Sequence, residues 1–99
     1  MDIERLKSSS KIKKFCQKHH IRRLSFFGSV VRGDFGPQSD IDVLVEFEPG
    51  HTPGLDFFLM EAELSRLLGG KVDLQTPNFL SPEFRHTVLS EAVQAYEQA

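Results

Sequence analysis

The chain has 99 residues, of which 39% are hydrophobic, and a formal net charge of −2 at pH 7. This length suits one domain, residues 1–99, with a modest core. A single cysteine, Cys16, excludes an internal disulfide and a cysteine-rich zinc site, and the four histidines are not at metal-ligand spacing. No apolar run approaches the ~20 residues that span a bilayer, and no signal-peptide pattern opens the chain, so we expect a cytoplasmic protein.

The charge is distributed unevenly along the chain. Residues 1–23 contain eight of the twelve Lys and Arg and carry a net charge of +6, whereas residues 24–99 carry −8. We interpret the basic segment as a solvated helix face; a docking patch for RNA or an acidic partner is the alternative. The segment shows no pattern for reading bases, and we do not expect direct nucleic-acid binding.

The first third of the chain predicts a helix, a strand and a short helix. The serines at 8–10 are favoured helix N-caps, and Ile12 and Phe15 begin a three- and four-residue apolar spacing that predicts a helix to about residue 19. Residues 22–27, RRLSFF, indicate a strand. After a turn, SVVRG at 29–33 is long enough for one short helix.

The clearest strand is DIDVLVEF, residues 40–47, which follows a loop at 36–38. Side chains alternate between the two faces of a strand. One predicted face is apolar and the other carries the acids: Ile41, Val43, Val45 and Phe47 against Asp40, Asp42, Leu44 and Glu46.

The second half predicts a helix, a strand and a helix. Apolar residues from Phe57 to Leu68 mark the first helix, which Gly69 and Gly70 end. KVDLQ, 71–75, is a short strand, and Ser81 with Pro82 begins a last helix ending near Tyr96. This order implies an α+β fold: a small mixed sheet of about three strands packed on helices.

Two aspartates interrupt the strand at 40–47, although Asp is depleted in strands. Asp40 and Asp42 lie two residues apart, which puts both carboxylates on one face, roughly 6.5–7 Å apart. A divalent metal such as Mg²⁺ would satisfy both charges. The alternative is a pair of solvent-facing aspartates on an exposed sheet face.

Gly28 and Ser29 mark the turn before the short helix. A glycine there permits close approach of a ligand to the backbone, and a helix start offers N–H groups to a phosphate. The alternative is a simple turn with Ser29 as N-cap. A Walker A loop is excluded, because Asp34 and Phe35 stand where that motif needs Lys and Ser or Thr.

Asp73 is a third carboxylate in a strand, between Val72 and Leu74. Laid beside the 40–47 strand, it would face the same side as Asp40 and Asp42. Three converging carboxylates suit a two-metal site for phosphoryl or nucleotidyl transfer. The alternative is an edge-strand aspartate paired with a nearby Lys71 or Arg32.

The spacing Gly28-Ser29, ten residues, then Asp40-Ile41-Asp42 resembles the G-S-x10-D-x-D signature of the DNA polymerase β-like nucleotidyltransferase superfamily. The fuller strings FGSVVRG (27–33), SDIDVLV (39–45) and KVDL (71–74) are similar to the minimal nucleotidyltransferases (MNT), the antitoxins of HEPN/MNT toxin–antitoxin pairs. The resemblance covers essentially the whole chain.

The resemblance implies a polymerase β-like fold and a role for each motif residue. Asp40 and Asp42 would hold two Mg²⁺ ions, and Asp73 would bind the catalytic one and orient or receive the acceptor proton. Gly28 and Ser29 would cradle the β- and γ-phosphates of ATP. Lastly, Arg32 would touch phosphate or pair with a carboxylate.

The implied activity is Mg²⁺-dependent transfer of AMP from ATP to a hydroxyl, a tyrosine, of a HEPN toxin partner. Two alternatives stay open: an antitoxin that neutralises its toxin by binding alone, and an enzyme that adenylylates a small molecule. One amphipathic helix accounts for most of the residues that follow Asp73, so no segment is left to enclose the acceptor. We therefore expect another chain to supply the side of the site that holds the acceptor.

Overall fold

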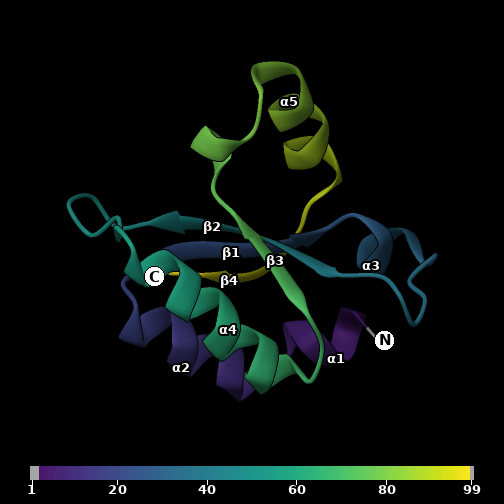
Figure 1. The fold of residues 1–99 in the computed structure, drawn as a ribbon, viewed down its shortest axis with the longest axis horizontal. Coiled ribbons are helices and arrows are strands. Elements are labelled where there is room, and N and C mark those ends of the chain that lie inside the picture. Colours follow the sequence, from purple (N-terminus) through teal and green to yellow (C-terminus); the bar gives the residue numbers. More distant parts are fainter. Residues whose placement is uncertain (1–2, 99) are drawn as a thin grey trace.

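The computed structural model describes residues 3–98. A four-stranded mixed sheet separates two unequal layers of helix (Figure 1). Its strand order is β3-β2-β1-β4. Strand β1 is antiparallel to both of its neighbours, whereas β2 and β3 are parallel. The strands are β1 (Ile21–Phe27), β2 (Ile41–Phe47), β3 (Val72–Gln75) and β4 (Val93–Glu97).

One face of the sheet is covered by α1 (Ile3–Lys7), α2 (Ser10–Lys18) and α4 (Asp56–Leu68), drawn below the sheet in Figure 1. The predicted boundaries of α2 and α4 are confirmed here, whereas α1 was not predicted from the sequence. The hydroxyl of Ser9 caps α2 by accepting from Lys11 N–H at 3.2 Å, and Gly69 ends α4 in the left-handed region. Sixteen buried residues form the main core at this face, among them Phe15, Phe26, Leu64 and Val43.

The alternation predicted for residues 40–47 is confirmed. Ile41, Val43 and Val45 are fully buried in the main core, and Phe47 packs against it. On the other face, Leu44 joins a second and much smaller cluster, with Phe27, Leu80 and Val88. Each side of β2 therefore has its own apolar partner layer.

The second face carries two short helical segments, η1 (Pro77–Phe79) and α5 (Pro82–Glu91), whereas α3 (Ser29–Arg32) contributes Val30 to the main core. Figure 1 shows η1 and α5 rising above the sheet, whereas α3 lies at one end of β1 and β2. As predicted, Ser81 caps α5 by accepting from Phe84 N–H, at 3.4 Å. Only Val88 of α5 is buried.

The prediction that the last helix continues to Tyr96 is wrong. The α5 helix ends at Glu91, and residues Val93–Glu97 form β4 on the open edge of β1, which raises the strand count from about three to four. Val and Tyr favour strands, and pairing satisfies backbone groups that β1 would otherwise leave exposed. The helical spacing of apolar residues could not reveal that distant partner.

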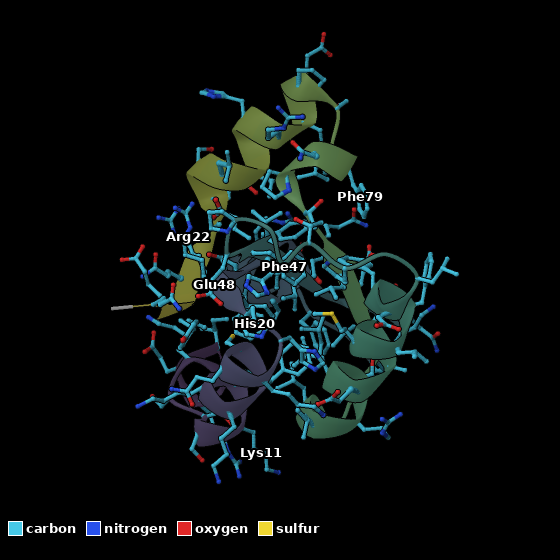
Figure 2. The ribbon with its side chains drawn as sticks, turned by 90° about the vertical axis from the view of Figure 1, so that its left-hand side faces the viewer. Lys11, His20, Arg22, Phe47, Glu48 and Phe79 are labelled. Carbon is cyan, nitrogen blue, oxygen red and sulfur yellow. The ribbon has the colours of Figure 1, made fainter. Side chains whose placement is uncertain are left out.

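Several charges of the basic N-terminal segment are paired with acids from the rest of the chain. Lys18 lies 3.2 Å from Glu63, and Arg23 binds Glu46 at 3.2 Å and Glu97 at 2.9 Å. Figure 2 shows Lys11 pointing away from the molecule on α2. Folding thus neutralises part of the charge asymmetry. Within residues 3–98, the helices are all too short or too polar to cross a membrane.

Candidate active site

Two of the predicted carboxylates are direct neighbours in the sheet. Asp42 of β2 and Asp73 of β3 are register partners in the parallel pair. Partners in adjacent strands share a face and lie about 4.8 Å apart in the hydrogen-bonding direction. Asp40, one residue before β2, is two positions from Asp42 and, like the other two, half-buried. The structure therefore pairs Asp42 with Asp73, as the sequence predicts, while Asp40 lies close enough for its charge to act on Asp42.

Gly28 lies directly against the Asp42 side chain. Its φ of 73° and ψ of −148° are a backbone conformation that is essentially restricted to glycine. A Cβ at this position would overlap Oδ2 of Asp42 and lie 3.1 Å from its Cγ. Position 28 therefore needs glycine twice, for its backbone conformation and for the space that the carboxylate occupies.

The environment of Asp42 raises the pKa of its carboxyl to about 6. Burial is the largest cause, followed by repulsion from Asp73 and then from Asp40, and Arg32 opposes the shift. Each cause disfavours or favours the ionised form in the expected direction. Near neutral pH Asp42 is mostly ionised in a place that disfavours the charge, and a bound cation would relieve this.

Ser29 and Arg32 begin and end the α3 helix. The half-buried Ser29 directly follows Gly28, next to Asp42. Arg32 is exposed, and its ion pairs are with Asp34 at 3.7 Å and Glu91 at 3.8 Å. Its charge still acts on Asp42, so Arg32 stands at the margin of the site rather than inside it.

Asp73 accepts a hydrogen bond from the side-chain amide of Gln75, at 2.9 Å. Among residues 3–98, Arg32 pairs with other acids, and no ion pair joins Asp73 to Lys71. The alternative of an edge aspartate held by a basic partner therefore finds no support. Sequence reasoning missed Gln75, although its two-residue spacing from Asp73 puts both side chains on one face.

A cavity of about 350 Å³ opens over Asp42 and Asp73. Its apolar walls come from Phe27, which is paired with Asp42 across the sheet, and from Phe79, Leu80 and Phe84 of the η1–α5 segment. The segment after Asp73 thus lines part of the site, which the sequence did not predict. No local sequence pattern could indicate this, because only the tertiary fold brings η1 and α5 over the sheet.

The carboxylates fit magnesium in the kind of donor they offer, since Mg²⁺ prefers hard oxygen ligands. Within residues 3–98, no group of three or more His, Cys, Asp or Glu side chains is arranged to hold a metal ion by itself. Protein sites for Mg²⁺ commonly supply one or two carboxylates and leave the remaining positions to water and substrate phosphates. Asp42 and Asp73 meet that lower requirement.

Comparison with known proteins gives matches along most of the chain. Residues 9–94 match the family model of the nucleotidyltransferase domain. A candidate protein adenylyltransferase of Methanocaldococcus jannaschii is 40% identical over 93 residues, which cover 94% of this chain and 97% of the relative. The protein adenylyltransferase MntA of Thermococcus cleftensis is 38% identical over 93 residues, 93% of this chain and 91% of that protein.

Solved structures share the fold. A candidate minimal nucleotidyltransferase superposes with a TM-score of 0.77 at 39% identity, over 94% of this chain and 95% of that one. A Shewanella oneidensis MNT antitoxin in complex with its tri-AMPylated HEPN toxin gives a TM-score of 0.70 at 19% identity, over 97% and 74% of the two chains; at that identity the likeness concerns the fold alone. The family match and the two relatives show that this chain belongs to the nucleotidyltransferase domain family.

Proposed function

We propose that this nucleotidyltransferase transfers AMP from ATP to a tyrosine hydroxyl of a HEPN-domain toxin and thereby acts as its antitoxin. The observation that carries the proposal is the in-register pair Asp42–Asp73, with Gly28 against Asp42. The names of the relatives, protein adenylyltransferases, support AMP as the transferred group. The HEPN complex of the Shewanella antitoxin supports the choice of partner.

The reaction is a displacement at the α-phosphorus of ATP. The hydroxyl oxygen of the acceptor forms a bond to that phosphorus, and the bond to the oxygen bridging the α- and β-phosphates breaks, so that pyrophosphate leaves. The hydroxyl proton passes to the carboxylate of Asp73. Gly28 and Ser29 would lie along the β- and γ-phosphates, because Gly28 leaves open backbone beside Asp42.

Asp40, Asp42 and Asp73 would hold two Mg²⁺ ions, which, when bound, neutralise phosphate charge and acidify the attacking hydroxyl. That acidification is needed on energetic grounds. Proton transfer from a tyrosine of pKa about 10 to an aspartic acid of ordinary pKa, about 3.9, is uphill by about 8 kcal/mol. Asp73 can therefore accept the proton only from a hydroxyl that the site has already made more acidic.

The direct test mixes the protein with Mg²⁺, with ATP labelled at the α-phosphate, and with a HEPN-domain protein as the acceptor. We expect label on a tyrosine of the HEPN protein and release of pyrophosphate. With the isolated chain alone, turnover of Mg-ATP should be very slow, because the acceptor is missing. Rapid labelling of a small free hydroxyl compound without a protein partner would instead favour the small-molecule enzyme.

Asp73→Asn separates chemistry from binding. This variant should keep most of the affinity for Mg-ATP and lose transfer, since the proposed role of Asp73 concerns the acceptor proton. Calorimetry measures the first quantity and the labelling assay the second. If the toxin is neutralised equally well by wild type and Asp73→Asn while neither labels it, the protein is an antitoxin that acts by binding alone.

A further inference from the structure

A second depression lies beside β3, between the first turns of α4 and η1. Its volume is about 400 Å³. It is more apolar than the cavity over the carboxylates, and its walls include Pro53, Phe57, Phe58, Glu61, Asp73 and Phe79. We refer to it as the aromatic groove. Figure 2 shows Phe79 on the segment that rises from β3, above α4.

Three phenylalanine rings form a row along the aromatic groove. The buried ring of Phe57 lies 6.4 Å from Phe58 and 5.4 Å from Phe79, centroid to centroid, with edge-to-face geometry in both pairs. The outer two rings are largely exposed to solvent, Phe58 at 69% and Phe79 at 66%. Large aromatic side chains contribute most when they are buried at an interface, and exposed ones grouped together mark interaction sites.

The aromatic groove and the active-site cavity share the residues Asp73, Gln75 and Phe79. The strand order β3-β2-β1 places this shared wall on one flank of Asp42, whereas the Gly28–Ser29 turn follows β1 on the other flank. The phosphates of ATP and the contents of the groove would therefore approach the carboxylates from opposite sides, which is the arrangement that an in-line displacement requires.

The outward N–H groups on the edge of β3 already have partners within the chain. The N–H of Leu74 donates to the carboxylate of Glu61 at 2.8 Å, and the N–H of Val72 donates to the hydroxyl of Ser65 at 3.0 Å. Both acceptors come from α4. The outward N–H groups of Val72 and Leu74 are therefore not free to pair with a ligand strand, which leaves the side chains of the groove as the main contacts.

We propose that the aromatic groove binds the acceptor segment of the partner protein, by taking up a bulky apolar side chain next to the hydroxyl that is modified. This inference rests on the proposed function and adds the residues that select the acceptor. Phe58 and Phe79 hold the apolar side chain, and the shared wall at Asp73 delivers the hydroxyl to the reacting phosphorus. The occupant is thus a tyrosine-bearing segment with an apolar neighbour, and not a lone polar loop.

The test compares Phe58→Ser and Phe79→Ser with two control variants. Leu59 is as exposed as Phe58, at 69%, and lies next to it on α4 without lining the groove. Leu89 is exposed on α5, also away from the groove. All four are exposed apolar side chains, so their replacement by serine should leave the fold intact, which circular dichroism and thermal melting verify.

For each variant we would measure KM for the HEPN-domain protein, kcat, and the Kd of Mg-ATP. Losing a buried phenylalanine contact should raise KM by about tenfold or more in Phe58→Ser and in Phe79→Ser. The Kd of Mg-ATP should stay unchanged in Phe58→Ser, because Phe58 does not line the active-site cavity, and Leu59→Ser and Leu89→Ser should match wild type throughout.

The outcomes separate the two proposals. If wild type labels the HEPN protein but the KM of Phe58→Ser and Phe79→Ser is unchanged, the groove assignment is overturned and the proposed function stands. An equal rise in KM for the control variants, or a matching loss of Mg-ATP affinity in Phe58→Ser, also overturns it. If wild type labels no HEPN protein, the proposed function fails, and this inference with it.

Discussion

The two faces of the sheet differ in how completely they are covered. On the face toward α2 and α4, sixteen buried residues form a continuous core. On the face toward α5, four buried residues form a much smaller cluster, and the carboxylates lie beside it under an open cavity. The aromatic groove opens at the adjoining edge of β3, between the two layers. The first face has the packing that stabilises a fold, and the second has the polar and open features that a site requires.

The difference shows that the site lies on the face of the sheet opposite the main core. Two consecutive residues of β2 serve the two faces: Val43 is buried in the core, and Asp42 lines the site. A half-buried carboxylate among like charges is unfavourable by itself, and a well-packed opposite face can compensate for it. Each of the following predictions would break or sharpen this division.

The largest effect should come from removing both charges of the Asp40–Asp42 pair. Asp40→Asn combined with Asp42→Asn should abolish Mg-ATP binding in calorimetry, because the remaining Asp73 cannot hold the cations alone. The melting temperature should stay the same or rise, since repulsion between carboxylates is removed. Unchanged Mg-ATP affinity in this variant would show that the site lies elsewhere.

Two apolar truncations compare a buried residue of the main core with an exposed residue of α5. Phe26→Ala, in the main core, should lower the free energy of unfolding by about 3–5 kcal/mol, because a large cavity remains. Leu89→Ala, on the outer side of α5, should change it by no more than about 0.5 kcal/mol. Urea unfolding measures both. A loss for Leu89→Ala as large as that for Phe26→Ala would show that the outer side of α5 is packed rather than exposed.

Gly28→Ala should lower both the stability of the fold and the affinity for Mg-ATP. The methyl group would displace the Asp42 carboxylate, and the backbone conformation is strained for alanine, so we expect a loss of about 1–3 kcal/mol together with weaker Mg-ATP binding. Gly36→Ala is the control, because a Cβ there meets no atom within 4 Å. Equal stability of the two variants would contradict the close contact between Gly28 and Asp42.

The smallest effect is a pH dependence of stability that Asp42 causes. Its pKa is about 6 in the fold against 3.8 as the reference value, so the folded state binds its proton more tightly than the unfolded state. The resulting stabilisation is complete below about pH 4 and is lost as the pH rises through about 6. For this partly exposed group we expect the loss to be about 1 kcal/mol once solvent screening is included.

Asp42→Asn removes this titration. We compare the free energies of unfolding of the variant and wild type without metal and nucleotide. Going from pH 4 to pH 7.5, this difference should shift in favour of the variant by about 1 kcal/mol. Chemical unfolding at several pH values gives the two curves. Parallel curves from pH 4 to 7.5 would show that neither burial nor the neighbouring acids raise the pKa of Asp42 in the folded protein.

The sequence by itself determined the local elements and the chemical residues of the site. Alternation of apolar and acidic residues in 40–47 predicted both faces of β2, and serine and glycine marked the ends of α2, α4 and α5. These features could be predicted because they depend on neighbours within a few residues, through side-chain periodicity and capping. The ten-residue spacing from Ser29 to Asp40 also lies within one local segment.

Tertiary structure alone decided where distant segments meet. Residues Val93–Glu97 satisfy a helical spacing as well as a strand, and only the open edge of β1 selects the strand. Likewise, the register of Asp42 with Asp73 and the placement of Phe79 beside Phe57 join residues separated by a helix. Such contacts depend on the packing of the whole chain, because backbone pairing and apolar burial are satisfied by whichever segment the fold brings near.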